Sequence, residues 1–332
     1  MASNEHLRQP GRYLRRTIGG FVALVVIAFF AVGWYWSRMP AIFYVTNEIA
    51  GQPVIPGYST ADTLIRVAET LLDKPGGYLS NDVTPPSVFM DNMLEWEFGV
   101  LTQVRDLARV MRNDYSRSQS QSTEDPALSV AEPLFFIEND SWMFPASETK
   151  YREAIDGFRA YRDRLSGDAA PPAQFFSRAD NLREWLAQVE KRLGSLSQRL
   201  SASVGQRRVN TDMSGVPSSA ATNEAPTDIV VKTPWLEIDN VFYEARGTAW
   251  ALVHFLRAVE FDFADVLDDK NATVSVRQII RELEASLEPM RSPMVLNGGG
   301  FGVFANHSLV MASYLSRANA AVIDLRELLD QG

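Results

Sequence analysis

The stretch that decides the fold is residues 175–200, which read FFSRADNLREWLAQVEKRLGSLSQRL. Its apolar residues recur at alternating intervals of four and three positions. These residues are Phe175, Ala179, Leu182, Leu186, Val189, Leu193, Leu196 and Leu200. A mean spacing of about 3.5 residues keeps them on one face of a helix, as in coiled coils and up-down bundles. The stretch therefore predicts a long helix that buries one face.

The same spacing recurs in two later stretches, residues 238–266 and residues 304–329. The first is marked by Ile238, Phe242, Ala245, Ala249, Leu252, Leu256, Val259, Phe263 and Val266, and the second by Phe304, Ser308, Met311, Leu315, Ala318, Val322, Leu325 and Leu329. Sustained heptad patterns call for long helices that pack at shallow angles. We therefore predict an all-α fold, an up-down bundle of long helices with heptad-type packing.

Shorter helical segments precede these stretches. Ser59 and Thr60 are typical N-cap residues and stand before apolar positions at helical spacing, so a helix is expected to begin there. Residues 74–77, Lys-Pro-Gly-Gly, are expected to end it. The aromatic segment 134–145 fits either a short strand pair or an irregular strap over the core.

The body of the chain divides into two helical regions, residues 59–204 and residues 235–332. Between them, residues 205–234 are rich in small and polar residues and lack periodicity, so we expect a flexible linker or loop. Before them, the Pro- and Gly-containing residues 37–58 are expected to form an extended tether. The sequence leaves open whether the two regions form one bundle.

The N-terminal part of the chain carries a long apolar segment. Residues 18–36 comprise 19 residues without a charge. As a helix they would span roughly 28 Å, close to the thickness of the hydrocarbon layer of a membrane. The segment ends in aromatic residues, which favour the lipid headgroup layer. We therefore predict a transmembrane helix whose ends are marked by Ile18, Trp34, Tyr35 and Trp36.

The charges around this segment predict its orientation. Four arginines and one glutamate precede it: Arg8, Arg12, Arg15, Arg16 and Glu5. By the positive-inside rule, residues 1–17 form a basic cytoplasmic tail and the body lies in the periplasm, anchored to the inner membrane by a single span. Residues 31–33 also resemble a signal-peptidase site, and the arginine pair resembles a twin-arginine signal. An uncleaved anchor is preferred, because the apolar run continues through bulky aromatic residues.

Composition narrows the classes of function. The formal net charge is −9 although the N-terminal tail is basic, so the body is strongly acidic. Such a body argues against nucleic acid as a partner, since phosphate binding needs clustered Lys and Arg. The sequence has no cysteine. Disulfides, thiol nucleophiles and thiolate metal sites are therefore excluded.

Few side chains in the sequence are candidates for catalysis or metal binding. His254 lies beside an apolar stripe and is expected to be a hydrogen-bonded core residue, because a di-iron bundle would need a glutamate where Ala251 stands. Glu95 and Glu97 are too closely spaced on a helix to converge on one bond, and they are expected to complement the helix dipole. Asp262 and the aspartates after it are expected to form a solvated acidic helix end. No metal site or cofactor is predicted.

Several segments of the chain resemble an uncharacterised family of gammaproteobacterial envelope proteins, known only as a domain of unknown function. They are residues 63–82, 92–101, 116–122 and 192–200. The resemblance covers nearly the whole chain. It implies a membrane-anchored protein, and it supplies no activity and no site residues.

Two functions are considered for this sequence. The favoured one is a non-catalytic interaction or scaffold module of the cell envelope, which binds another envelope protein or itself while its anchor lies in the lipid bilayer. The alternative is a periplasmic hydrolase or a small-ligand-binding protein with a site between two Gly-rich loops, residues 74–82 and 297–307. Such loops can bind anions where they precede a helix. The residues of this site would be Lys74, Tyr78, Asn81, Asp82, Asn297 and His307.

Overall fold

The computed structural model of the chain describes residues 10–46, 55–118, 122–209, 228–292, 294–299 and 302–331. Parts of four predicted segments lie outside these ranges: residues 1–9 of the tail, 47–54 of the tether, 210–227 of the linker and 300–301 of the second Gly-rich loop. The helices are α1 (Pro10–Trp36), α2 (Tyr58–Asp73), α3 (Asp91–Val110), α4 (Pro126–Leu134), α5 (Ser147–Leu165), α6 (Ala179–Ser201), α7 (Ile238–Asp262), α8 (Ala264–Asp269), α9 (Thr273–Ser286) and α10 (His307–Asp330).

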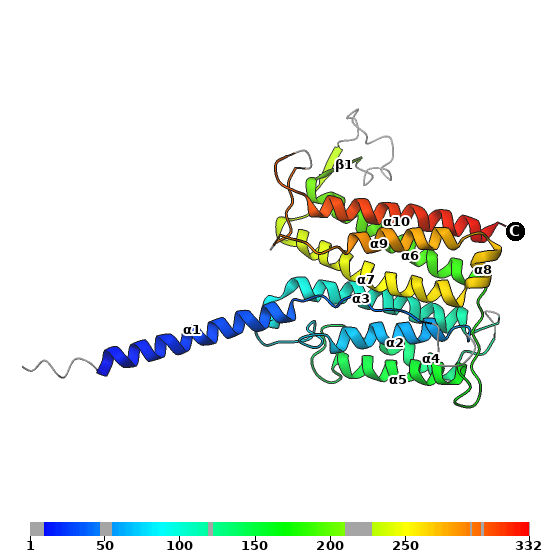
Figure 1. Cartoon of the computed structure of the whole chain (residues 1–332), viewed down its shortest axis with the longest axis horizontal. Helices are drawn as coiled ribbons and strands as arrows, with labels where there is room; N and C mark the ends of the chain where they lie inside the picture. Colours follow the sequence, from blue (N-terminus) through cyan, green and yellow to red (C-terminus); the bar gives the residue numbers. More distant parts are fainter. Residues whose placement is uncertain are drawn as a thin grey trace, which may run out of the picture.

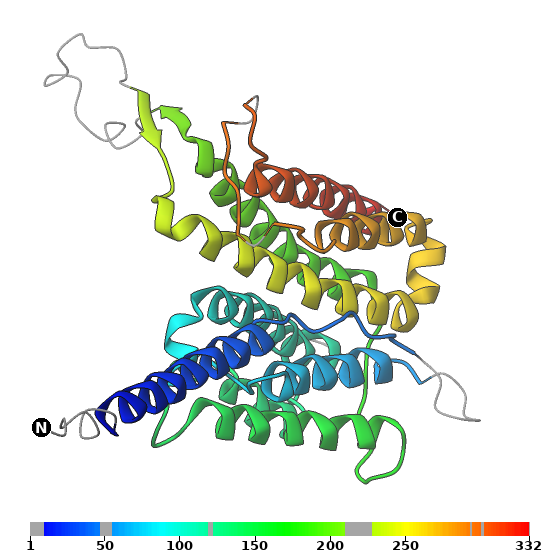
Figure 2. The same ribbon diagram turned by 60° about the vertical axis from the view of Figure 1, so that its left-hand side comes forward.

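The helices form one bundle with two halves (Figures 1 and 2). In one half, α2 and α4 pack with α3, and α5 packs against α2 and α4. In the other half, α6, α9 and α10 pack with α7. Helices α3 and α7 run side by side where the halves meet. Residues of both predicted helical regions share one hydrophobic core. The all-α prediction is confirmed, with one short antiparallel pair, β1 (Gln206–Val209) and β2 (Asp228–Val231), at the ends of the predicted linker.

The junction between α3 and α7 depends on two glycines. A Cβ atom at Gly247 of α7 would lie 2.1 Å from the carbonyl oxygen of Trp96, and a Cβ atom at Gly99 of α3 would lie 2.2 Å from that of Glu244. Glycine costs a helix interior about 0.5–1 kcal/mol relative to alanine. Here the absence of a side chain lets the two backbones come into contact, and this contact joins the halves of the bundle.

The three heptad stretches form α6, α7 and α10. Most buried residues of α6 and α10 follow the predicted spacing, whereas α7 is buried on all sides from Ala245 to Leu256. Their boundaries differ from the prediction. Helix α6 begins at Ala179, so Phe175 precedes it and packs against Phe263, 5.6 Å away between ring centroids. Phe263 also separates α7 from α8. Helix α10 begins at His307, because Asn306 caps it, and Phe304 is exposed in the loop before it.

The N-terminus of α2 is capped by a residue from α7 rather than by its own serine or threonine. The backbone N–H and the hydroxyl of Thr60 both donate to Oδ2 of Asp262, at 2.6 and 2.7 Å. Burial raises the pKa of Asp262 to about 6, and the bonds from Thr60 oppose this rise. The predictions of a local N-cap and of a solvated Asp262 are therefore wrong, because long-range capping leaves no local sequence signal.

The tether begins as an extended segment that packs on the bundle. The backbone N–H of Phe43 donates to Nε2 of His254 at 3.0 Å, and Nδ1 of His254 lies 2.7 Å from the carbonyl oxygen of Trp250, to which it donates. The rings of Phe43 and His254 lie 3.9 Å apart between centroids. Burial lowers the pKa of His254 to about 4. The prediction of a hydrogen-bonded core histidine is confirmed, and residues 37–46 are attached to α7.

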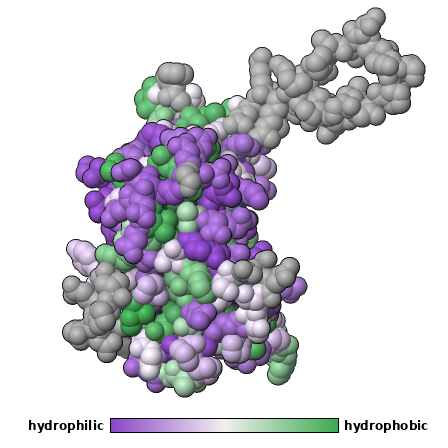
Figure 3. Space-filling view, turned by 90° about the vertical axis from the view of Figure 1, so that its right-hand side faces the viewer, coloured by the Kyte–Doolittle hydropathy of each residue, from purple (hydrophilic) through white to green (hydrophobic). Residues whose placement is uncertain are grey.

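The two ends of the bundle differ. Helix α1 projects from one end (Figure 1), and its last residue, Trp36, packs against Gly76. The aromatic segment 134–145 lies after α4 as an irregular strap rather than a strand pair, with Phe135 buried and Phe144 exposed. Figure 3 shows the end opposite α1, where hydrophilic residues cover most of the upper part of the surface.

Candidate functional site

The first Gly-rich loop is fixed by Glu97 of α3. Its carboxylate forms an ion pair with Nζ of Lys74, and both side chains are fully buried. The same carboxylate accepts hydrogen bonds from the backbone N–H groups of Leu79 at 2.9 Å and Ser80 at 2.8 Å. Burial raises the pKa of Glu97, and the charge of Lys74 opposes this rise. Lys74 is therefore a structural counter-ion, and the prediction that Glu97 mainly complements a helix dipole is wrong.

The other residues predicted for this loop have different surroundings. Tyr78 is buried against Tyr151, with the ring centroids 5.7 Å apart, and burial raises its pKa. Asn81 is also buried, and its Nδ2 donates to the carbonyl oxygen of Ser141 at 3.2 Å. Asp82 is exposed. The polar side chains of Lys74 and Asn81 thus join this loop to other parts of the fold. Of the four predicted residues of the loop, Asp82 alone is exposed to solvent.

The second Gly-rich loop is held by bonds within its own length. Asn297 and Asn306 form an antiparallel bridge, and the hydroxyl of Ser308 donates to Oδ1 of Asn297 at 2.8 Å. The backbone N–H of Leu296 donates to Nδ1 of His307 at 2.9 Å. In its neutral form His307 therefore carries its proton on Nε2. Burial lowers the pKa of His307, which favours this neutral form.

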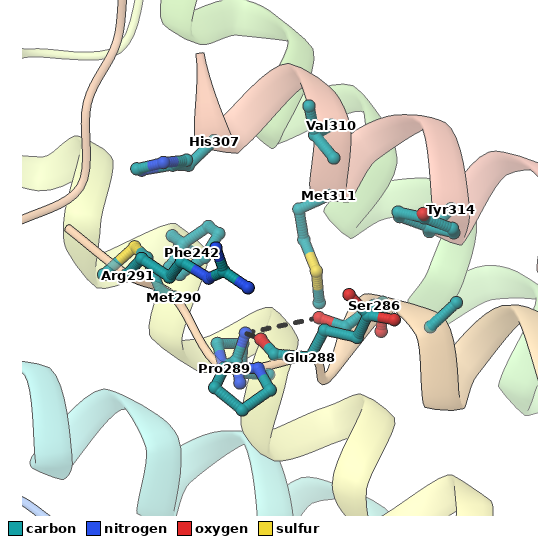
Figure 4. Close-up of a pocket in the computed structure, with 12 residues that line it drawn as sticks. Phe242, Ser286, Glu288, Pro289, Met290, Arg291, His307, Val310, Met311 and Tyr314 are labelled. Carbon is teal, nitrogen blue, oxygen red and sulfur yellow. Dashed lines mark hydrogen bonds between the residues drawn. The ribbon is translucent and has the colours of Figure 1, made fainter. Parts of the chain in front are cut away.

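His307 lines a cavity between α7, α9 and α10 (Figure 4). Its volume is about 240 Å³. The lining residues are Phe242, Arg246, Ala285, Ser286, Glu288, Pro289, Met290, Arg291, His307, Val310, Met311 and Tyr314. Sites for drug-sized ligands usually measure roughly 300–1,000 Å³. This cavity therefore suits one or two side chains of a partner, or a small molecule, better than an extended substrate.

The cavity holds a buried cation, Arg246 of α7. Its guanidinium donates to the carbonyl oxygens of Ser286, Leu287 and Glu288, at 3.3, 2.8 and 3.1 Å, and so caps the C-terminus of α9. Burial lowers the pKa of Arg246. Among the residues that the structure describes, its Nε has no hydrogen-bond partner and its guanidinium forms no ion pair with a carboxylate.

The arrangement favours recognition over catalysis. Met290, Met311 and Phe242 provide apolar contact. Arg246 and the exposed Arg291 provide positive charge, which outweighs the single negative charge of the exposed Glu288. Such a site fits an apolar group that carries a carboxylate. Two other lining residues could in principle react. The hydroxyl of Ser286 donates to the carbonyl oxygen of Leu283 at 2.6 Å, and Nδ1 of His307 is occupied by Leu296, so these two do not form a nucleophile–base pair.

The structure does not bring the six predicted ligand residues together. The loop of residues 74–82 lies in the half that contains α2, and the loop of residues 297–307 lies in the half that contains α10 (Figures 1 and 2). Of the six residues, His307 alone lines the cavity. Sequence reasoning missed Arg246, although a charged residue within the apolar stripe of α7 was the available signal.

A family model described as "Uncharacterized protein conserved in bacteria (DUF2333)" matches residues 10–332. The chain belongs to this family. The match covers α1 as well as the bundle that forms the cavity. No curated protein and no solved structure matches the chain. The resemblance noted in the sequence is thus confirmed as that of an uncharacterised bacterial family, while its gammaproteobacterial range and its membrane anchoring stay predictions.

Proposed function

We propose that this protein is a single-pass, membrane-anchored interaction module of the cell envelope that performs no catalysis. The observation that supports this most is α1. Its residues 15–36 have a mean hydropathy of 2.3 in their most apolar window, and none of that window is buried in the protein. The segment is roughly 33 Å long as a helix, which matches the hydrocarbon layer of a bilayer. A core helix of a soluble protein would instead bury such a surface.

The two ends of α1 support an orientation with the bundle in the periplasm. Trp34 and Tyr35 are exposed at the end nearest the bundle, and the guanidinium of Arg38 lies 4.1 Å from the centroid of the Trp34 ring. Exposed Trp and Tyr at the end of a span favour the headgroup layer. In the sequence, four arginines precede the apolar segment at its other end, and by the positive-inside rule that end faces the cytoplasm.

Reporter fusions test the anchor and its orientation. Alkaline phosphatase fused after the last residue of the full chain is expected to be active, since it folds only in the periplasm, whereas a fused green fluorescent protein is expected to be dark. The fusion should also stay in the membrane after a carbonate wash at the mass of the uncleaved chain. A bright fluorescent fusion, or a soluble shortened product, would contradict the proposal.

The interaction role is supported by the cavity around Arg246. A buried cation without a paired carboxylate in the described residues, beside methionine and aromatic side chains, suits an apolar partner segment that carries an acidic residue. The partner would be another envelope protein or a second copy of this chain. In both cases the partner's carboxylate would approach Arg291 at the exposed side of the cavity.

Photo-cross-linking in whole cells tests this role. Val310 lines the cavity and is 55% exposed, whereas Ile323 lies on the same helix outside the cavity and is 37% exposed. A photoreactive residue at position 310 is expected to give one discrete protein adduct, and the same residue at position 323 to give none. An adduct of twice the mass of the chain would identify self-association. The variant Arg291→Glu should weaken the adduct at 310, and equal adducts at both positions would contradict the cavity as the contact.

A further inference from the structure

The loop between α2 and α3 turns back along the membrane helix. The ring of Phe89 lies 6.3 Å from the ring of Phe29 of α1, in an edge-on contact. Closer to the bundle, a Cβ atom at Gly33 would lie 3.8 Å from Cβ of Pro86. The loop therefore follows α1 from its bundle end towards its middle.

These contacts set the depth that the loop reaches. Phe29 precedes Trp36 by seven positions in α1, which corresponds to roughly 10 Å along the helix axis. If the aromatic end of α1 lies in the headgroup layer, Phe29 lies within the hydrocarbon layer, and so does the ring of Phe89 beside it. This step rests on the proposed function, because it takes α1 as the membrane span.

The chemistry of the loop suits an apolar environment. Residues 83–89 read VTPPSVF and contain no charge. Their large apolar side chains point outwards, with 60% of Val83, 52% of Val88 and 73% of Phe89 exposed. In water such exposure would be unfavourable for a loop of this size, whereas in the acyl-chain region it would bury these side chains.

Two prolines and two backbone hydrogen bonds shape the end of the loop. Pro85 and Pro86 have no N–H group to satisfy. The N–H of Phe89 donates to the carbonyl oxygen of Pro86 at 2.9 Å, and the N–H of Met90 donates to the carbonyl oxygen of Ser87 at 2.8 Å. The two prolines and the bond of Phe89 lower the number of unpaired backbone donors in the loop, and such donors are costly in lipid.

Charged and aromatic residues mark where the loop would return to the membrane surface. Exposed Asp82 precedes it and exposed Asp91 follows it, so both its ends lie at polar positions. The Asn81–Ser141 hydrogen bond holds the strap to the first Gly-rich loop, and Trp142 and Phe144 of this strap are 56% and 91% exposed. Exposed Trp next to an inserted segment is typical of membrane interfaces.

We propose that residues 83–89 form a second membrane contact, a membrane loop that inserts Val88 and Phe89 into the acyl chains of the periplasmic leaflet beside α1. The lipid surface is its partner. With two attachments, the bundle is held in one orientation relative to the membrane instead of rotating about a single helix. The N-terminal end of α10, at the end of the bundle from which α1 projects, faces the membrane in the same arrangement (Figure 1).

The absence of cysteine allows a direct test on the full chain. Single variants Leu24→Cys, Phe89→Cys and Val274→Cys carry an environment-sensitive fluorophore in vesicles of phosphatidylethanolamine and phosphatidylglycerol. Leu24 lies exposed on α1, and Val274 lies 77% exposed at the start of α9. Lipid with a nitroxide on its acyl chain should quench the label at position 89 to an extent comparable with that at position 24. The label at position 274 should keep its fluorescence.

The outcomes separate the two proposals. Quenching at position 24 without quenching at position 89 would overturn the membrane loop and leave the anchor intact. No quenching at either position would overturn the anchor, and with it this inference. A fourth variant, Val88→Cys, serves as a second reporter in case the label at position 89 alters the turn, and it should be quenched like position 89. Quenching at position 274 equal to that at 89 would also overturn the membrane loop, because it would show that the label itself seeks the lipid.

Discussion

The two Gly-rich loops have similar composition and opposite surroundings. The loop of residues 74–82 takes its key partner from another helix, since Glu97 of α3 pairs with Lys74 and binds the N–H groups of the loop. The loop of residues 297–307 is held by its own residues, and its His307 lines a cavity. Both precede long helices, and the alternative function predicted from the sequence places both in one binding site.

The residues that a loop contacts, more than its glycines, determine whether it can border a binding site. A loop that is closed by a buried ion pair belongs to the core and leaves no room for a ligand. A loop that is closed by local bonds to Asn297 and Asn306 depends less on the bundle and can border a cavity. Changes in the first loop should therefore cost stability, and changes in the second should cost little.

The largest effect is expected from Glu97→Gln. This change leaves the ammonium of Lys74 buried without a counter-charge, so the free energy of unfolding should fall by about 3–5 kcal/mol. Urea denaturation of the detergent-solubilised full chain, followed by circular dichroism, measures the change. The matched control is Glu95→Gln on the same helix, which is half-buried and should change stability by no more than about 0.5 kcal/mol.

A double variant identifies the cause of this loss. Lys74→Met with Glu97→Gln removes the unpaired ammonium and keeps an oxygen that can accept from Leu79 and Ser80. We expect it to recover most of the stability, because an ion pair can be replaced by groups that need no counter-charge. A double variant as unstable as Glu97→Gln would show that the amide bonds, and not the charge of Lys74, dominate.

A smaller effect is expected from Gly76→Ala. Gly76 has φ +91°, and a Cβ atom there would lie 2.8 Å from Cγ of Trp36. The left-handed backbone alone costs a residue with a side chain about 1–2 kcal/mol. In the second loop, Gly299→Ala meets nothing within 4 Å and should be nearly neutral. Thermal melts of both variants test the contrast, and equal losses would contradict it.

The helical part of the fold could be predicted because burial repeats locally along α6, α7 and α10. Most buried side chains of α6, from Leu182 to Leu200, fall at the predicted spacing, and Trp185 is a buried residue outside it. The junction of the halves could not be predicted in the same way. Gly99 and Gly247 act through backbones that lie far apart in the chain, and their only local signal is glycine inside a helical pattern.

In the candidate site, too, residues with a local sequence pattern could be predicted and residues with distant partners could not. His307 was found from its place between a Gly-rich loop and a helix, which is a local pattern. Arg246 was not found, because its role comes from the end of α9, to which it donates three hydrogen bonds. Glu97 was misassigned for the same reason, since its partners Lys74 and Leu79 belong to a loop that precedes its own helix.

A third prediction concerns the end of the second loop. Oδ1 of Asn306 accepts from the N–H of Leu309 at 2.9 Å, and its Nδ2 donates to the carbonyl oxygen of Gly298 at 2.7 Å. Asn306→Ala removes the cap of α10, so the loss should be about 1 kcal/mol. Asn306→Asp keeps the capping oxygen and should retain part of the stability. If Asn306→Ala lowered the free energy of unfolding as much as Glu97→Gln does, the second loop would be as important for stability as the first, and the two loops would not differ as described.

The smallest effect is expected from the titration of His307. Burial lowers its pKa in the folded protein, so the unfolded chain binds the proton more readily as the pH falls through the ordinary histidine pKa of about 6.5. Stability should therefore decline from pH 7 towards pH 5, by less than the one-proton limit of about 1.4 kcal/mol per pH unit. His307→Gln should flatten this slope, measured as the difference between the two proteins across the range. His254 is present in both proteins, so its contribution cancels in the difference. An unchanged slope would mean that His307 is as solvated in the folded protein as in the unfolded chain, and hence that the cavity it lines is open to water.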